Sequence, residues 1–238
     1  MSFYADFSQV YDQIMDQSLY DEWLDFSLRY FPQNTKTVLE LACGSGALAV
    51  KFAQAGFEVT GLDISEKMLT LARKKLPTAE FITADMRKFR LAKKFDAVTC
   101  YSDSLCYLSS MAELRQVFEK IHDLLNDKGV FIFDVHSTHQ VDKVFPNYSY
   151  HENEEDFAFL WDSYAGNQPH SIEHQLSFFI KGRDEKFIRK DELHIERTYE
   201  IAEFLENLRI FSDVKVLADF TDDAPVVDSA RWFFVCKK

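Results

Sequence analysis

The stretch that decides the fold is VLELACGSG, residues 38–46. It begins as a short apolar run with one acidic residue, Glu40, and it ends in a Gly-Ser-Gly turn before an amphipathic segment. This order predicts a strand, a tight ligand-binding loop and a helix. Gly44 and Gly46 have no Cβ atom, so the loop can bend sharply and a ligand can approach its backbone closely.

Strands and helices are expected to alternate through the first half of the chain. Further apolar runs predict strands at residues 58–62, 80–83, 95–100 and 130–135. Helical spacing predicts helices at residues 48–55, 65–75 and 111–125. Apolar strands that alternate with helices indicate an α/β fold, with a parallel, doubly wound, Rossmann-like sheet. Ligands of such sheets bind beyond the carboxyl ends of the strands. Five polar or aromatic residues are expected there, namely Asp63, Asp85, Tyr101, Asp103 and His136.

The two flanks of this pattern differ from it. Residues 3–31 are rich in aromatic side chains at helical spacing, and Pro32 ends the run. Period-two alternation predicts a three-stranded antiparallel meander at residues 157–164, 171–180 and 186–199, after a solvated acidic turn at 152–156. We therefore expect a single domain over 1–238 in three parts: a helical cap at 1–35, a cofactor-binding core at 36–140 and 199–238, and an insertion at 145–198 that covers the substrate side.

Composition narrows the functional classes. The net charge of −12 disfavours a nucleic-acid substrate, because such proteins usually present a basic face. The four cysteines show no disulfide or zinc spacing, and the N-terminus lacks a signal-peptide pattern. No apolar run reaches membrane-spanning length. We expect a cytoplasmic protein, a monomer or homodimer, with no membrane partner.

Three interpretations of the glycine loop compete: a site for NAD(P), a site for S-adenosylmethionine, and a loop without a ligand. Residues 44–49 also fit the loose dinucleotide pattern G-x-G-x-x-G/A. Glu40 would repel a pyrophosphate but would attract a sulfonium and an ammonium group. Asp63 is placed to accept hydrogen bonds from ribose hydroxyls, and Asp85 from the adenine amino group. Three acids with no basic residue near the loop in sequence favour S-adenosylmethionine.

The chain resembles the class I S-adenosylmethionine-dependent methyltransferases. The motifs that resemble theirs lie at residues 40–46, 59–65, 83–86, 95–98 and 124–129, the last as the turn before the fifth strand. One departure is Ala42, where that family often has its first glycine. The resemblance implies a seven-stranded, mostly parallel sheet whose antiparallel last strand, residues 232–235, lies beside the fifth. The antiparallel insertion is similar to that of small bacterial enzymes of the aminosugar and glycine N-methyltransferase type.

The resemblance implies the following cofactor site. Gly44 and Gly46 lie against the methionine tail, Glu40 lies near its ammonium group, and Asp63 binds the ribose. Asp85 and Met86 contact the adenine. The remaining residues expected at the cofactor are Tyr11, Ala42, Ile64, Met68 and Tyr101. S-adenosyl-L-homocysteine is the expected product.

The acceptor side is less defined. Candidate catalytic residues are His136, Tyr101 and Asp103; His136 could act as a base or orient the acceptor, or be a structural histidine. His136 and His139 form an HxxH pair, but no further ligand has the spacing of a metal site, and we expect no metal. We expect methyl transfer by in-line displacement to N or O of a small molecule. Alternatives are an RNA or protein acceptor, a non-catalytic cofactor-binding module, and an NAD dehydrogenase.

Overall fold

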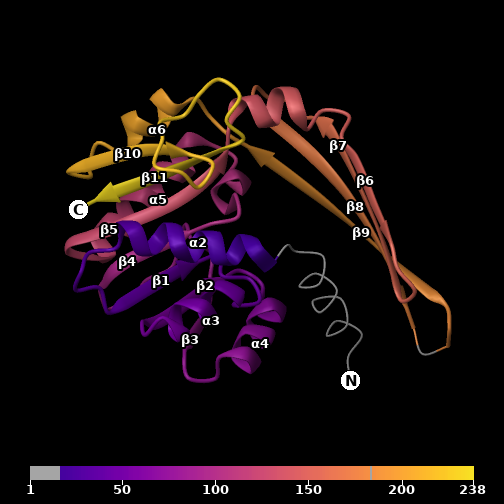
Figure 1. The fold of residues 1–238 in the computed structure, drawn as a ribbon, viewed down its shortest axis with the longest axis horizontal. Coiled ribbons are helices and arrows are strands. Elements are labelled where there is room, and N and C mark those ends of the chain that lie inside the picture. Colours follow the sequence, from indigo (N-terminus) through magenta and orange to yellow (C-terminus); the bar gives the residue numbers. More distant parts are fainter. Residues whose placement is uncertain (1–16, 183) are drawn as a thin grey trace.

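Two β-sheets form the framework of the computed structural model, which describes residues 17–182 and 184–238. The larger sheet has seven strands in the order β10-β11-β5-β4-β1-β2-β3 (Figure 1). Its strands are β1 (Thr37–Leu41), β2 (Glu58–Asp63), β3 (Glu80–Thr83), β4 (Phe95–Cys100), β5 (Leu125–His136), β10 (Asp213–Ala218) and β11 (Arg231–Lys237). β11 pairs antiparallel with both neighbours, and the other pairs are parallel. The predicted α/β sheet with its antiparallel last strand is confirmed.

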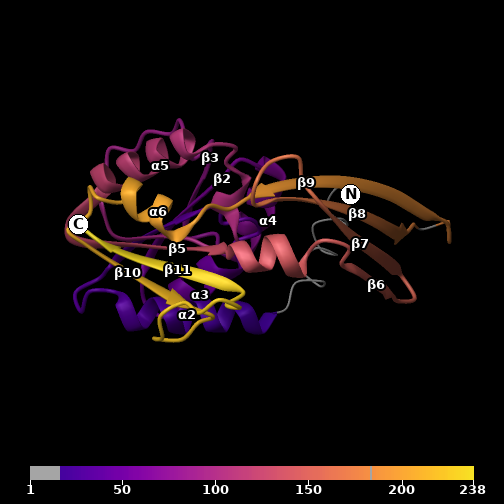
Figure 2. The same ribbon diagram turned by 90° about the horizontal axis from the view of Figure 1, so that it is seen from above.

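Helices cover both faces of this sheet (Figure 2). They are α2 (Gln17–Tyr30), α3 (Ala47–Gln54), α4 (Glu66–Lys75), α5 (Met111–Leu124) and α6 (Ile201–Asn207), with a short 3₁₀ turn, η1 (Ser104–Tyr107). α5 and α6 bury their apolar side chains in one core cluster, whereas α2, α3 and α4 contribute to a second cluster on the opposite face. Burial on both faces explains why the central strands are continuous apolar runs.

Local signals in the sequence set two helix ends. The Ser65 side chain accepts a hydrogen bond from the Met68 amide at 3.3 Å and caps α4. Gly56 follows α3 with φ +97°, a conformation that glycine adopts at low cost. A serine N-cap such as Ser65 stabilises a helix by about 1 kcal/mol.

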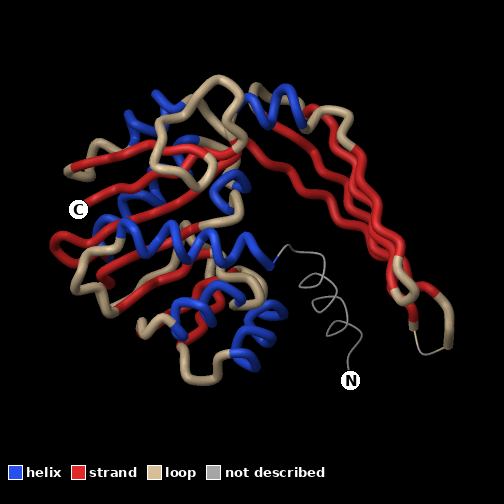
Figure 3. The backbone as a smooth tube through the Cα atoms, viewed as in Figure 1, coloured by secondary structure: helices blue, strands red, loops and turns tan. Residues whose placement is uncertain are grey.

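The smaller sheet is the insertion, and it extends away from the core as long, curved strands (Figure 3). It contains β6 (Ser149–Asn153), β7 (Phe157–Ala165), β8 (Ser171–Lys181) and β9 (Phe187–Arg197), joined to β5 through a π-helical turn, η2 (Gln140–Val144). The three predicted antiparallel strands are confirmed as β7, β8 and β9, but β6, which pairs with β7 and includes the first two residues of the predicted turn at 152–156, was missed. β6 is an exposed edge strand with no apolar alternation, and its pairing with β7, rather than its own pattern, makes it a strand.

Another local prediction was wrong at the start of β5. Residues 124–129, expected as a turn, mostly belong to the strand, where the pairing with β4 shifts register between Phe95 and Ala97. Close to this register shift, the backbone of Lys128 has a positive φ angle of 66°. No helix in the described part of the chain has both the length and the apolar character needed to span a membrane.

Candidate active site

The glycine loop lies at the carboxyl end of β1 and curls back against β2. Ala42, Gly44 and Gly46 all have positive φ angles, of 52°, 53° and 75°. A Cβ atom on Gly46 would lie 2.8 Å from the Cβ of Ala72, so this glycine allows α3 and α4 to approach each other. A Cβ atom on Gly44 would meet nothing within 4 Å. The loop therefore keeps an open backbone surface at Gly44, where a ligand can approach.

A basic residue does lie beside the loop, contrary to what the sequence indicated. Lys75, at the end of α4, has its Nζ 2.9 Å from the Ser45 hydroxyl oxygen. The lysine is 30 residues away in sequence, so only the packing of α4 brings it here.

Glu40 is a buried acid with an unsatisfied oxygen. Its Oε2 has no hydrogen-bond partner among the described residues, and its side chain is enclosed in the centre of the sheet. Burial, and then the charge of Asp63, raise the Glu40 pKa well above its usual range. A cationic group beside Glu40 would reverse this shift, because an opposite charge favours the carboxylate. The ammonium group of S-adenosylmethionine fits that requirement.

Asp63 is the last residue of β2, and its side chain links the glycine loop to this strand. Its Oδ2 accepts a hydrogen bond from the Gly44 amide at 2.8 Å, and its Oδ1 accepts one from the Ser65 amide at 2.7 Å. Burial raises the Asp63 pKa, and these backbone hydrogen bonds oppose the rise. A carboxylate has about four acceptor sites, so it can still accept from two ribose hydroxyls.

A cavity of about 180 Å³ opens beside the loop. The residues that line it are Ala42, Leu62, Asp63, Ile64, Ala84, Asp85, Met86, Arg87, Ser104, Tyr107 and Leu108. Ile64 is 71% exposed although it is apolar, and it gives the cavity an apolar wall. An aspartate at one end and an apolar wall beside it suit an adenosine group.

Arg87 is a lining residue that sequence reasoning missed. Its guanidinium group contacts the Asp85 carboxylate at 2.6 Å and the Glu113 carboxylate at 2.5 Å. The hydrogen bond from Arg87 holds the Asp85 pKa below its usual value. Asp85 is thus ionised and held in place, ready to accept a hydrogen bond. The sequence signal that could have identified Arg87 was its position two residues after Asp85.

The remaining predicted cofactor residues are placed differently. The Tyr101 side chain is 5% exposed, bonds the Ser27 hydroxyl at 2.6 Å and stacks on Trp23 beneath α2. Met68 is half-buried on α4 and does not line the cavity. Tyr11 lies outside the described residues. The structure therefore brings Asp63, Ile64, Asp85 and Met86 together, while Tyr101 and Met68 pack elsewhere.

A buried ion cluster occupies the carboxyl ends of β4 and β5. The Arg231 guanidinium donates to Asp103 at 2.6 and 2.9 Å and to Asp134 at 2.6 Å. Asp134 also accepts from the Trp23 indole at 2.8 Å. Asp103 is therefore held in a bidentate pair, which gives it a positioning role rather than a free carboxylate. Sequence analysis missed Arg231, because nothing local marks a partner 128 residues away.

His136 and Glu196 extend this cluster towards the insertion. The His136 Nε2 lies 3.1 Å from Asp103 Oδ2 and 3.6 Å from Glu196 Oε2. Burial and the nearby Arg231 lower the His136 pKa well below its usual value. Burial and the charge of Asp103 raise the Glu196 pKa to about 8, although Tyr107 and Arg231 oppose the rise. Glu196 lies on β9, and no sequence signal separated it from the other acids there.

An aromatic side chain fixes the ring of His136. Phe145, which follows η2, packs edge-on against His136 at 4.8 Å and against His174 of β8 at 4.9 Å. His174 also contacts Ser163 Oγ at 2.7 Å, and burial lowers its pKa to about 4. The insertion is thereby packed against the end of β5 through neutral histidines.

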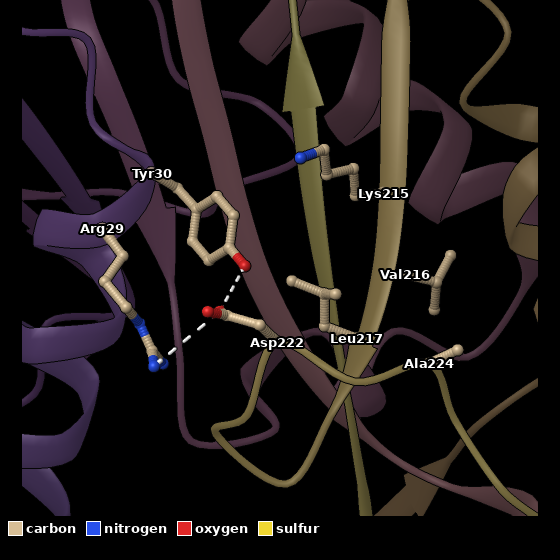
Figure 4. Close-up of a pocket in the computed structure, with 7 residues that line it drawn as sticks. All are labelled: Arg29, Tyr30, Lys215, Val216, Leu217, Asp222 and Ala224. Carbon is tan, nitrogen blue, oxygen red and sulfur yellow. Dashed lines mark hydrogen bonds and ion pairs between the residues drawn. The ribbon is translucent and has the colours of Figure 1, made fainter.

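A second, larger cavity lies away from this edge. It measures about 660 Å³ and lies between α2 and β10, where Tyr30 donates to Asp222 at 2.6 Å (Figure 4). Its lining residues are Arg29, Tyr30, Lys215, Val216, Leu217, Asp222 and Ala224. It contains no residue of the glycine loop or of the strand ends, so the smaller cavity is the candidate site. The described residues hold no cluster of potential metal ligands.

Known proteins resemble the chain along its whole length. A Geobacillus sp. (strain WCH70) protein, named as a methyltransferase, is 41% identical, and the match covers 99% of each chain. A family described as "Methyltransferase domain" matches residues 38–129. The dTDP-3-amino-3,4,6-trideoxy-α-D-glucopyranose N,N-dimethyltransferase of Streptomyces venezuelae is 38% identical over 41% of this chain and 41% of its own. An S-adenosylmethionine-dependent methyltransferase structure from Clostridium acetobutylicum ATCC 824 has a TM-score of 0.85 and 24% identity, with 99% of both chains covered, and shares the fold.

Proposed function

Because the chain belongs to the class I S-adenosylmethionine-dependent methyltransferases, we propose that it methylates a nitrogen atom of a small-molecule acceptor. S-adenosylmethionine is the cofactor, and S-adenosylhomocysteine is the product. The alternative acceptor atom is an oxygen. The proposal concerns the acceptor and the residues that hold both molecules.

The proposed cofactor site uses the residues around the smaller cavity. Asp63 accepts from the ribose, Asp85 and Met86 contact the adenine, and Glu40 faces the ammonium group. The open backbone at Gly44 leaves room for the methionine tail. When bound, the cofactor supplies a methyl group on a positively charged sulfur. The protein aligns the acceptor with that group, and alignment of this kind contributes about 7–11 kcal/mol to catalysis.

One observation favours nitrogen as the acceptor atom. Three buried carboxyl groups, those of Asp103, Asp134 and Glu196, gather at the edge beside the cavity, and a single arginine offsets them. Burial raises the pKa of each of these carboxyl groups, so an incoming cation would lower those pKa values and be stabilised in return, whereas a neutral alcohol gains nothing comparable. An amine enters as a cation and leaves as a cation after methylation. The Streptomyces venezuelae relative, whose name states an amino sugar and N,N-dimethylation, supports the same choice.

Matched pairs of acceptors provide the test. The purified enzyme and S-adenosylmethionine are incubated with dTDP-3-amino-3,4,6-trideoxyglucose, glucosamine or glycine, and with the hydroxyl counterpart of each amine. S-adenosylhomocysteine formation is measured by mass spectrometry, and the methylated atom is located by NMR. We expect turnover with at least one amine and none with its hydroxyl partner. Methylation of the hydroxyl compounds alone would contradict the proposal.

A further inference from the structure

Glu196 is a buried acid that the fold leaves incompletely satisfied. The residue is 7% exposed, and its Oε2 has no hydrogen-bond partner among the described residues. The Nε2 atom of the neutral His136 lies 3.6 Å from this oxygen and is already 3.1 Å from Asp103 Oδ2. An unsatisfied buried carboxyl oxygen costs stability, so its presence at a site edge indicates a functional role.

Tyr107 connects Glu196 to the cofactor cavity. Its side chain lines that cavity and is 49% exposed. Its hydroxyl group lies 2.7 Å from His194 Nδ1 and is also a hydrogen-bond partner of the Glu196 carboxyl group. Tyr107 therefore lines the cavity and has its hydroxyl group towards Glu196.

We infer that Tyr107 and Glu196 form a proton relay that deprotonates the acceptor amine, with the Tyr107 hydroxyl contacting the amine and Glu196 receiving the proton. This inference rests on the proposed function. An ammonium nitrogen has no lone pair, so it must lose a proton before it attacks the methyl carbon. The amine proton passes to the Tyr107 oxygen as the Tyr107 proton passes to the Glu196 carboxylate. The nitrogen lone pair then forms the N–C bond, the C–S bond breaks, and its electron pair remains on sulfur. The product leaves as a methylated ammonium ion.

The surroundings of Glu196 make it a suitable proton acceptor. Its pKa of about 8 lies close to that of an α-amino group, whereas a solvated glutamate would bind the proton much too weakly. The titratable and charged groups that face it come from several elements and are Asp103, Cys106, Tyr107, His136 and Arg231. His136 is neutral and Asp103 is paired with Arg231, so neither takes this role.

Glu196→Gln tests the relay with a side chain of the same size. At pH 8, where about half of Glu196 is ionised and can accept a proton, we expect S-adenosylhomocysteine formation with dTDP-3-amino-3,4,6-trideoxyglucose to fall about 100-fold, with the S-adenosylmethionine Kd unchanged within about twofold. At pH 9.5, where more of the amine is already neutral in solution, the deficit should shrink to less than about fivefold. Tyr107→Phe should show the same rescue from a smaller deficit, about tenfold. A purely structural role would give no rescue by pH.

Glu173→Gln is the matched control. Glu173 lies on β8 and pairs with Ile195, so its side chain lies on the opposite face of the sheet from Glu196. This variant makes the same charge change and should keep the wild-type rate and pH profile.

Thermal unfolding supplies a readout that needs no cofactor. The folded-state pKa of Glu196 is raised above its unfolded value of 4.5, so its stabilising proton is lost as the pH rises through about 8. Glu196→Gln lacks this loss, and its Tm relative to wild type should increase between pH 6 and pH 9. Amine methylation by Glu196→Gln at the wild-type rate would overturn the relay and leave the proposed function intact. Failure of the wild-type enzyme with every amine would overturn both.

Discussion

Glu40 and Glu196 are two buried glutamates, each with an unpartnered oxygen, in regions that are built differently. Glu40 lies in the central strand β1, paired with β2 and β4 on either side, so the core itself fixes its position. Glu196 lies near the end of β9 in the insertion and meets the core at His136 of β5 and Tyr107 of η1. Both raised pKa values result chiefly from burial.

The difference separates two tasks. The proposed cofactor region is made of residues that follow one another at successive strands, from Glu40 through Asp63 to Asp85. The proposed acceptor region is assembled from β5, β9, β11 and the segment after β4, which are distant in sequence. We therefore expect changes in the insertion to alter the acceptor while the cofactor region stays intact, and the following substitutions test that separation.

The largest effect is expected from a substitution of Arg231 in the proposed acceptor region. Arg231→Met removes the only cation bonded to Asp103 and Asp134 among the described residues. Two buried carboxylates without a cationic partner should lower the free energy of unfolding by about 3–5 kcal/mol, measured by urea denaturation. Arg209→Met is the control, because Arg209 is exposed and lies just after the end of α6. A loss below about 1 kcal/mol would show that the cluster contributes little.

The next largest effect is expected from a substitution of Asp63 in the proposed cofactor region. Asp63→Ala removes both the anchor of Gly44 and the predicted ribose acceptor. Hydrogen bonds to a charged group contribute about 1.5–3 kcal/mol each, so the S-adenosylmethionine Kd should rise at least about 100-fold by calorimetry. Asp123→Ala, whose side chain is exposed, should leave the Kd unchanged. An unchanged Kd in Asp63→Ala would remove this residue from the cofactor site.

Glu40→Gln tests the buried glutamate of β1 through the pH dependence of stability and through cofactor affinity. The folded-state pKa of Glu40 is raised, so the stability that it contributes is present below the unfolded value of 4.5 and is lost as the pH rises through the folded pKa. The variant should gain stability relative to wild type as the pH rises. It should also bind S-adenosylmethionine about 10- to 100-fold more weakly, from the loss of a charged partner. Equal affinity of the two proteins at pH 8 would contradict a contact with the ammonium group.

The smallest effect concerns the backbone of the loop. Ala42 has a φ of +52°, a conformation that costs a residue with a Cβ about 1 kcal/mol. Ala42→Gly should therefore stabilise the protein by about 0.5–1 kcal/mol in thermal unfolding. Destabilisation would mean that the Ala42 methyl group packs more favourably than its backbone is strained.

Much of the cofactor side could be predicted because its signals are local. Strand, loop and helix follow in order at residues 38–54, and an aspartate ends β2 at Asp63. Ala42, Ile64, Asp85 and Met86 line the smaller cavity, and their places follow from the same order. The packing of Tyr101 could not be predicted, because the direction of a side chain at a strand end depends on what packs beside it, here Ser27 and Trp23 of α2.

The sequence by itself determined the sheet, its helices, the glycine loop and the kind of cofactor, because periodicity and strand-end acids are properties of neighbouring residues. The tertiary structure alone decided the pairing of Arg231 with Asp103 and Asp134, the contact between Tyr107 and Glu196, and the fourth strand of the insertion. Those features join residues that are far apart in the chain. Burial and charge act on them only after the insertion has folded against the core.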